Sequence, residues 1–288
     1  MDKVNRVMLT SLFTNIFLSI FKIIFGILGS SGALIADGIH SLSDMMTDIF
    51  ASLGNIISKK PADKEHPFGH GNAEYITCLV IGIIIFMMGV NVIVSAATKS
   101  SNIPDIYVSI VSLVTIIIKL VLSSYIIKKG KEYDSNILTS SGKESLTDVI
   151  SSFIVLLSVI LSNISKKIEV LSYSDKIAMI VVGALIINIS IEIIKENLSN
   201  LLGKKVLDEE YIKFIKKTIK KYKDINNIDS LIIIKYGPLK KIDCEVSMDE
   251  NMQLKKVHNI IDDIEKDIKR KDDTITNIMI HVNPSKSI

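Results

Sequence analysis

The chain has 288 residues, 48% of them hydrophobic, and a mean hydropathy of +0.39. Soluble domains are seldom so apolar, so this composition predicts a membrane protein. The formal net charge of +3 is too small to indicate binding to nucleic acid, and two cysteines do not make a disulfide framework.

The first apolar segment, Val7–Leu28, has charged flanks. It is too long for the apolar region of a signal peptide and lacks a cleavage site of small residues. We therefore expect it to remain in the mature protein as a membrane helix.

Six apolar segments have about the 20 residues that a membrane-spanning helix needs. They are Val7–Leu28, Ala33–Ile57, Ala73–Ala97, Ile103–Ile127, Leu138–Ile160 and Ile177–Ile194. The short loops between them predict a compact six-helix transmembrane bundle over residues 1–200. After Leu201 the composition changes to mixed Lys, Asp, Glu and Ile, which predicts a separate domain over residues 201–288.

Basic residues concentrate on one side of the predicted spans. That side carries Lys3, Arg6, Lys59, Lys60, Lys64, Lys128, Lys129, Lys131, Lys195, Lys204 and Lys205, and the other carries Lys99, Lys166, Lys167 and Lys176. The richer side is expected to be cytoplasmic. The bias predicts a multi-pass protein of the cell membrane with both termini and the C-terminal domain in the cytosol.

The second span contains four ionisable residues, Asp37, His40, Asp44 and Asp48. Their separations of three, four and four residues place them on one helical face. Each Asp at mid-membrane depth costs roughly 2.5–3.5 kcal/mol on insertion scales, and such residues usually mark a substrate path. His40 and Asp44, one turn apart, have the spacing to hold one metal ion. The alternative is a polar cluster that joins neighbouring helices.

The fifth span repeats this spacing with Glu144 and Asp148. Two helices with two ligands each would complete a four-ligand site of His40, Asp44, Glu144 and Asp148. Four ligands suit tetrahedral zinc, but one imidazole with three carboxylates also suits Mn²⁺ or Fe²⁺. The alternative is that Glu144 and Asp148 are solvated at the entrance of the helix, next to Lys143.

The loop of residues 61–71 holds Asp63, His66 and His70 within eight positions. Pro67 and the glycines favour a turn over a helix, and the zinc-protease signature HExxH is absent. A second metal site and a turn with hydrogen-bonding histidines both fit this pattern.

The residues from Asp208 to Pro284 have the pattern of a small α+β domain. Apolar residues recur at helical spacing in Glu209–Tyr222 and in Val257–Ile268. The expected strands are Leu231–Tyr236, Lys241–Met248 and Thr274–Val282, with a turn at Gly237-Pro238 and with Ile242, Cys244, Val246 and Met248 facing inward. An αββαβ order predicts a ferredoxin-like two-layer sandwich.

The stretches SGALIADGIHSLSDMMTDIF (31–50) and KPADKEHPFGHGNAE (60–74) resemble those of the cation diffusion facilitator family. Its members are dimeric divalent-metal/proton antiporters. The resemblance covers nearly the whole chain and implies six spans, ligand pairs in the second and fifth spans, and a cytosolic ferredoxin-like domain. The chain has no His-rich loop between the fourth and fifth spans, which favours an exporter of the prokaryotic type.

The resemblance also implies site residues. His40, Asp44 and Asp148 match the family's transport-site ligands, whereas Glu144 stands where zinc transporters usually have His and manganese transporters often have Asp or Asn. The residues that match the loop site of bacterial zinc/iron members are Asp63, His66 and His70.

In the tail, His258 and His281 match ligands of the family's cytosolic binuclear site. Asp229 and Glu245 stand where better-known members have His, and Asn283 stands where they have a bridging Asp. A neutral Asn cannot bridge two cations as a carboxylate does, so a single, weak or vestigial tail site is expected.

These observations predict proton-coupled efflux of Zn²⁺, Mn²⁺, Fe²⁺ or Co²⁺ from the cytosol by alternating access of the intramembrane site. Metal binding needs deprotonated ligands, so loading displaces protons. The alternative is a non-transporting, metal-sensing membrane subunit. The chain is expected to be no enzyme and to carry no prosthetic group. The expected partners are metal ions, protons, the lipid bilayer and a second copy, which would cover the sheet face carrying Glu245, His281 and Asn283.

Overall fold

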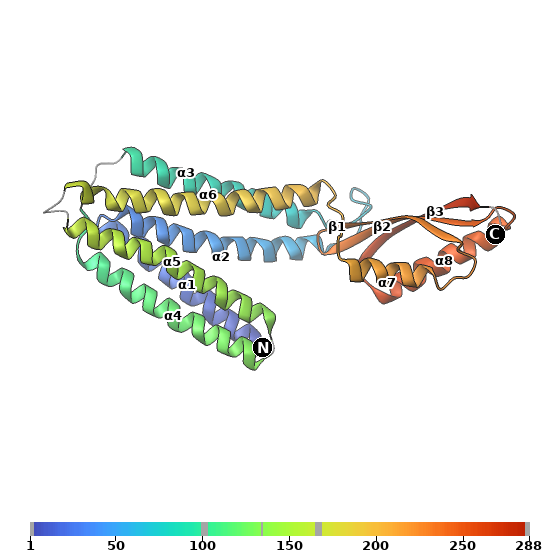
Figure 1. The fold of residues 1–288 in the computed structure, drawn as a ribbon, viewed down its shortest axis with the longest axis horizontal. Coiled ribbons are helices and arrows are strands. Elements are labelled where there is room, and N and C mark those ends of the chain that lie inside the picture. Colours follow the sequence, from blue (N-terminus) through green and yellow to red (C-terminus); the bar gives the residue numbers. More distant parts are fainter. Residues whose placement is uncertain (1–2, 99–102, 134, 165–168, 286–288) are drawn as a thin grey trace. The chain divides into compact units, whose positions relative to one another are not determined.

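The computed structural model describes residues 3–98, 103–133, 135–164 and 169–285 (Figure 1). The helices are α1 (Lys3–Leu28), α2 (Gly32–Ser58), α3 (Ala73–Thr98), α4 (Tyr107–Glu132), α5 (Asn136–Ile164), the 3-10 helix η2 (Glu169–Tyr173), α6 (Ser174–Leu201), α7 (Glu209–Ile219) and α8 (Leu254–Lys271). The strands are β1 (Asn227–Tyr236), β2 (Leu239–Asp249) and β3 (Ile275–Ser285). Contacts group the chain into two compact units, residues 1–49 with 81–193 and residues 50–80 with 194–288.

Among the described residues, five helical segments are long and apolar enough to cross a membrane. They are Arg6–Leu28, Ala73–Thr98, Tyr107–Glu132, Leu138–Ile164 and Leu171–Leu201. The remaining predicted span lies in α2, whose 27 residues include three aspartates and a histidine and contain no sufficiently apolar window of spanning length. Five of the six predicted spans therefore coincide with apolar helices, and α2 qualifies by length alone.

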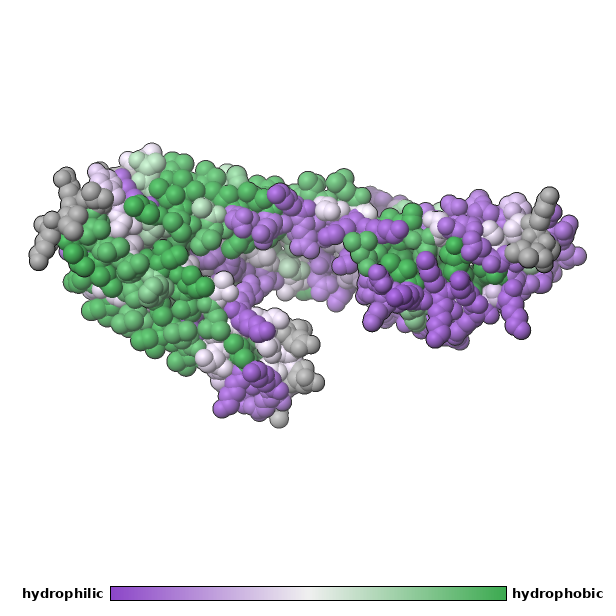
Figure 2. Space-filling model, in the orientation of Figure 1, coloured by the Kyte–Doolittle hydropathy of each residue, from purple (hydrophilic) through white to green (hydrophobic). Residues whose placement is uncertain are grey.

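The long helices expose large apolar side chains, as the green surface over them in Figure 2 shows. Phe13, Phe17 and Val121 are each more than 60% exposed. Such extended apolar surface marks an interaction surface on a soluble protein and is the normal outer surface of a membrane helix. The chain is a membrane protein with several apolar helices.

The fourth predicted span begins later and ends later than its apolar segment indicates. Pro104 precedes α4, which begins at Tyr107 and continues through the lysines to Glu132. Proline has no N–H to donate within a helix, and lysine is a good helix former. The apolar segment thus marks the part of α4 that is suited to lipid, but it does not mark the residues at which the helix begins and ends.

Helices α4 and α5 pack closely because small residues lie where they meet. A Cβ atom at Gly130 would collide with Thr139, and one at Gly142 would collide with Ile127. Small residues allow such backbone approach between membrane helices. The buried face of α4 that results includes Lys119, which is thereby directed toward α5.

The start of α2 is held by a carboxylate from the start of α6. Asp175 accepts hydrogen bonds from the backbone N–H groups of Gly32 (2.9 Å) and Ala33 (3.3 Å) and from the Ser31 hydroxyl (2.8 Å). A carboxylate in this position satisfies N–H groups that have no partner within the helix and compensates the helix dipole.

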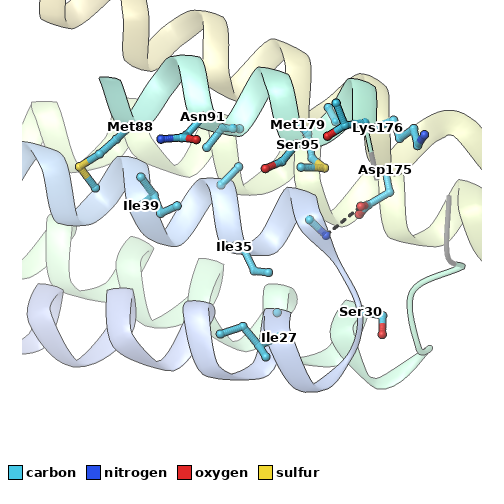
Figure 3. Close-up of a pocket in the computed structure, with 16 residues that line it drawn as sticks. Ile27, Ser30, Ile35, Ile39, Met88, Asn91, Ser95, Asp175, Lys176 and Met179 are labelled. Atoms are coloured by element: carbon cyan, nitrogen blue, oxygen red, sulfur yellow. Dashed lines mark hydrogen bonds between the residues drawn. The ribbon is translucent and has the colours of Figure 1, made fainter. Parts of the chain in front are cut away.

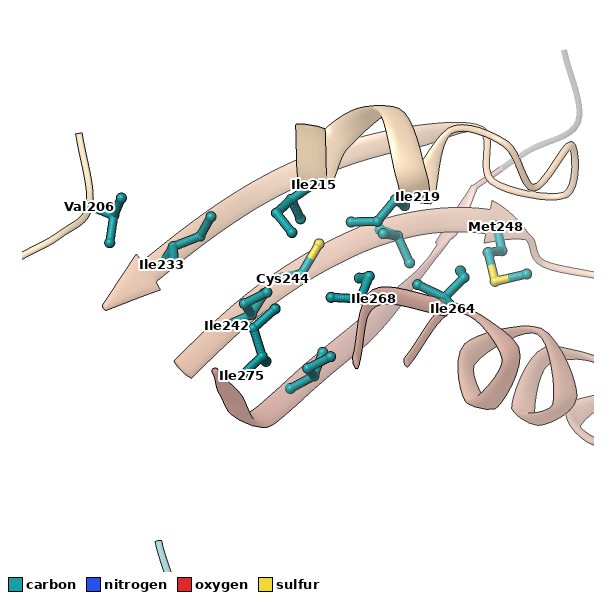
Figure 4. Packing of buried hydrophobic residues seen from close by; sticks show 12 residues of the cluster. Val206, Ile215, Ile219, Ile233, Ile242, Cys244, Met248, Ile264, Ile268 and Ile275 are labelled. Atoms are coloured by element: carbon teal, nitrogen blue, oxygen red, sulfur yellow. The ribbon is translucent and has the colours of Figure 1, made fainter. Parts of the chain in front are cut away.

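The C-terminal elements follow the predicted order αββαβ and form a three-stranded sheet of order β1-β2-β3. Strands β1 and β2 are antiparallel, and β2 and β3 are parallel. The side chains of Ile242, Cys244, Val246 and Met248 are buried, as predicted, in a core with residues from α7 and α8 (Figure 4). Helices cover one face of the sheet, and Glu245 and His281 are exposed on the other.

The turn between β1 and β2 lies at Gly237-Pro238, as predicted, and Gly237 has a φ of 63°. Strand β1 begins at Asn227, four residues before the predicted start. Its polar first residues pair with β2 across a bulge between Ile228 and Ser230. Cross-strand pairing extends the strand where composition gives no signal.

The buried Cys244 thiol provides a test of the tail core. Burial raises its pKa to about 11, and the side chain has no exposed area. Since the thiolate is the reactive form, we expect a maleimide to label native protein more than about tenfold more slowly than unfolded protein. Mass spectrometry of the Cys244 peptide in a Cys78→Ser background measures this rate.

The variant Ile242→Ala should accelerate that labelling, because removing a buried Ile side chain costs about 2–5 kcal/mol. Ile242→Val is the matched control, with an expected cost of about 0.5–1.5 kcal/mol. Equal labelling of native and unfolded protein would contradict the packing described here.

Candidate metal site

Three predicted ligands from two helices meet inside the bundle. His40 and Asp44 come from α2 and Asp148 comes from α5, and one ligand atom of each lies within 4.8 Å of the others. One helical turn on α2 brings His40 Nδ1 and Asp44 Oδ2 to 3.9 Å. Their side chains are 7% and 24% exposed, and that of Asp148 is 17% exposed.

Two of these ligand atoms lack hydrogen-bond partners. His40 Nδ1 and Asp44 Oδ2 are buried and form no hydrogen bond within the part of the chain that the structure describes. Their separation of 3.9 Å is too long for a hydrogen bond between them. Since buried polar atoms are normally paired, two such atoms that face each other are suited to a cation between them.

Lys119, which was not among the residues predicted for this site, also contacts it. Its Nζ atom lies 2.7 Å from Asp148 Oδ2, and its side chain is 4% exposed. The available signal was a single lysine inside the otherwise apolar fourth span, where ionisable residues are usually functional.

Glu144, the fourth predicted ligand, is not part of the three-residue cluster. It is exposed, one turn before Asp148 on α5, and lies within electrostatic range of Asp48, Asp148 and Lys119. The structure therefore brings together three of the four predicted ligands.

Asp37 shares a helical face with His40 but forms a different interaction. Its carboxylate lies 2.8 Å from Lys22 Nζ and accepts hydrogen bonds from the hydroxyls of Ser151 and Ser152, each at 2.8 Å. Lys22 in turn donates to Ser152 at 2.9 Å and to Ser41 at 3.3 Å. This buried network compensates both charges and occupies Asp37 as a structural partner of α1 and α5.

The loop residues Asp63, His66 and His70 form a second cluster with ligand atoms within 4.8 Å. The Asp63 carboxylate accepts backbone hydrogen bonds from His66 (2.7 Å) and Glu65 (3.0 Å), and these hold its pKa below the ordinary value. The two imidazole rings lie 4.4 Å apart, and His70 Nε2 is 3.4 Å from Asp63 Oδ2. Both the metal site and the hydrogen-bonded turn predicted for this loop remain compatible with this geometry.

The predicted tail ligands are only partly brought together. Glu245 and His281 are paired across β2 and β3. The Asn283 amide donates to Asp229 (3.1 Å) and to Glu245 (3.4 Å), and the Ser247 hydroxyl donates to Asp229 and lowers its pKa. His258 lies on α8, where its imidazole is 3.7 Å from Asp262. Among the described residues, these five do not form a cluster of three close ligand atoms.

A cavity of about 770 Å³ lies between α1, α2, α3 and α6 (Figure 3). Its walls are mostly apolar, with polar side chains from Asn91, Ser95, Asp175 and Lys176. His40 and Asp44 do not line it, although their α2 neighbours Ala36 and Ile39 do. This cavity was not predicted from the sequence.

Family models match both parts of the chain. The model of the cation efflux transmembrane domain matches residues 8–202, and that of the cation efflux protein cytoplasmic domain matches residues 207–285. The chain belongs to the cation diffusion facilitator family. This family consists of transporters, so a divalent metal is a substrate and not a catalytic cofactor, and the C-terminal elements are its cytoplasmic domain.

Curated relatives align over most of their length. The manganese efflux system protein MneP of Bacillus subtilis is 33% identical to this chain, and the alignment covers 97% of this chain and 95% of the length of MneP. An uncharacterized transporter of Methanocaldococcus jannaschii is 28% identical over 98% of this chain and 99% of its own. The magnetosome protein MamB of Paramagnetospirillum magneticum is 26% identical over 91% of this chain and 88% of its own.

We expect the buried Lys22–Asp37 ion pair to affect the stability of the protein. Asp37→Leu should destabilise this family member by about 3–5 kcal/mol, because the Lys22 charge stays buried without its partner. The double variant Lys22→Met/Asp37→Leu should be less destabilised than either single variant. Thermal unfolding of purified protein in one detergent measures the effect.

An exposed pair serves as the control for that experiment. Glu209 and Lys213 lie 3.3 Å apart with side chains 82% and 75% exposed, so Glu209→Leu should cost below about 1 kcal/mol. A double variant as unstable as the sum of its two single variants would contradict the network described above.

Proposed function

We propose that this protein exports a divalent transition-metal ion from the cytosol in exchange for protons. The observation that carries the proposal is a pair of buried atoms, His40 Nδ1 and Asp44 Oδ2, which face each other at 3.9 Å beside Asp148 and have no hydrogen-bond partner among the described residues. A structural polar cluster would use these atoms for hydrogen bonds, as Asp37 does. Because His40 Nδ1 and Asp44 Oδ2 are not used in this way, they suit an ion that binds reversibly.

Manganese is the first candidate among Zn²⁺, Mn²⁺, Fe²⁺ and Co²⁺. The site offers one imidazole and two carboxylates, with a third carboxylate one turn away in Glu144, and carboxylate oxygens suit Mn²⁺ better than soft metals. The name of the relative MneP, a manganese efflux system protein, agrees with this assignment.

Glu144 is proposed as a ligand of one conformational state. It lies on the same helix as Asp148, at the i, i+4 spacing that His40 and Asp44 have on α2. Its exposed carboxylate would bind the ion on arrival or complete the site when the bundle reorients.

Proton coupling follows from the ligand types. A metal ion binds neutral imidazole and ionised carboxylates, so protons and metal compete for the same atoms of His40, Asp44 and Asp148. A bundle that opens alternately to each side would then release metal where protons bind. This competition is the reason for proposing antiport over simple diffusion.

The proposed topology has six spans. With 27 residues, α2 is about 40 Å long, which exceeds the roughly 30 Å of a bilayer core. Its charged residues face Lys22 and α5, so they do not prevent insertion among the other helices. The basic residues near the helix ends support a cytosolic location for both termini.

The tail is proposed to be ferredoxin-like and to pair with a second copy. Its order αββαβ and its single helix-covered sheet face support this. The open face, with Glu245, His281 and Asn283, is available for an isologous contact. The metal sites proposed in the loop (Asp63, His66 and His70) and in the tail (Asp229, Glu245, His258, His281 and Asn283) would be peripheral to transport.

The alternative, a non-transporting metal-sensing subunit, would bind metal through the tail. It is less favoured because the three-residue cluster lies in the membrane helices. Metal binding and transport that persist after deletion of residues 205–288 would exclude this alternative.

Substitution of the central ligands tests the transport proposal. Asp44→Ala and Asp148→Ala should each reduce metal flux by more than about tenfold, because each removes one of few charged ligands. Flux is measured in reconstituted vesicles with an imposed pH gradient, and Glu209→Gln, an exposed carboxylate on α7, is the control. Unchanged flux in either variant would refute this assignment of the site.

Exchange of Glu144, the fourth proposed ligand, tests the choice of metal. Glu144→His should raise Zn²⁺ flux relative to Mn²⁺ flux by several-fold, since imidazole suits zinc and carboxylate suits manganese. Competition among Zn²⁺, Mn²⁺, Fe²⁺ and Co²⁺ in the same vesicles provides the ratio. An unchanged ratio would mean that residues other than Glu144 determine selectivity.

A further inference from the structure

Lys119 places a basic side chain at the proposed transport site. The residue lies in the middle of the buried face of α4, and its side chain is 4% exposed. Its Nζ atom is 2.7 Å from Asp148 Oδ2, a distance typical of a charge-assisted hydrogen bond. One of the three clustered ligand residues therefore already holds a cation that belongs to the protein.

The other buried lysine of this region is already compensated. Lys22 pairs with Asp37 and donates to Ser41 and Ser152. Asp37, in turn, is occupied by Lys22 and two serine hydroxyls. Among the described residues, no hydrogen bond joins the Lys119 side chain to this network, although the two ion pairs lie within electrostatic range of each other. The charges of Lys119 and Asp148 also act on the cluster itself.

Charge counting shows the consequence for a metal ion. A neutral His40 with ionised Asp44 and Asp148 carries two negative charges, and the Lys119 ammonium reduces this to one. Two cations close together repel strongly where the effective dielectric constant is low. An ion that uses Asp148 Oδ2 must therefore displace the ammonium from that oxygen.

The lysine side chain can make this movement. Its ammonium is a point charge on a flexible four-carbon stem, so it can leave one oxygen without a change in the backbone. It also lies within electrostatic range of Asp44 and Glu144, which keeps its charge compensated near the site.

We infer that Lys119 is a tethered counter-cation of the transport site, which holds Asp148 when metal is absent and is exchanged for the metal ion on loading. This inference rests on the proposed function and adds a residue that sets the affinity of the site. The ammonium weakens metal binding enough for release, and it compensates the empty site so that the bundle can return without metal. A purely structural ion pair would instead position Asp148 and favour metal binding.

The sign of the change in affinity separates these two roles. Purified full-length protein is titrated with Mn²⁺ and, separately, with Zn²⁺ by calorimetry at one pH. Lys119→Met should tighten binding by about tenfold or more, since it removes the competing charge, and Lys119→Arg should bind like the unmodified protein. In vesicles, Lys119→Met should lower both the half-saturating metal concentration and the maximal flux.

A second neutral variant keeps the test decisive if Lys119→Met does not fold, as judged by gel filtration. Lys119→Gln also removes the charge but keeps a hydrogen-bond donor for Asp148, and it should show the same tightening. Adding Asp44→Ala to either neutral variant should abolish the gain. Unchanged or weaker binding in the folded neutral variants would overturn the role of Lys119, although Asp44-dependent binding by the unmodified protein would still support the proposed function. Absence of that Asp44-dependent binding would overturn both.

Discussion

The compensation of buried charge is the constraint on which the helical part of this protein depends. An isolated ion in apolar surroundings is costly, so charged residues there are expected in pairs. Lys22 pairs with Asp37 and Lys119 pairs with Asp148, each within 2.8 Å. His40 and Asp44 lie beside these pairs, and in the part of the chain that the structure describes their facing atoms form no hydrogen bond. The proposed metal site therefore lies where buried polar atoms are left without a hydrogen-bond partner among the described residues.

This arrangement accounts for the ionisable residues of α2, which has no sufficiently apolar window of spanning length. Asp37 of α2 contacts α1 and α5. One and two turns further along α2, His40 and Asp44 face Asp148 of α5. The same helix begins against Asp175 of α6. Because α2 contacts several helices through polar groups, a change in their positions would alter the site directly, as the proposed alternating access requires.

The C-terminal domain packs differently from the membrane helices, because a cytoplasmic domain is surrounded by water and not by lipid. It buries one face of a three-stranded sheet under two amphipathic helices and leaves the other face polar. The polar residues on that face are connected by Asn283, which bonds to Asp229 and Glu245. An amide that donates to both carboxylates already satisfies part of their hydrogen-bonding capacity, which fits the expectation of a weak or vestigial metal site there.

The sequence alone determined the membrane class, the apolar helices, the αββαβ order of the tail and the pairing of His40 with Asp44. These depend on composition and on periodicity within one element, which are local properties. The tertiary structure decided which of the four residues on the α2 face are compensated, that Asp148 has Lys119 as its partner, and that Glu144 lies outside the central cluster. Those properties depend on distances between side chains on different helices. Helical spacing therefore predicted His40 and Asp44 as candidate ligands on α2, and the packing of α1 and α5 against α2 showed that Asp37 is a structural partner of Lys22.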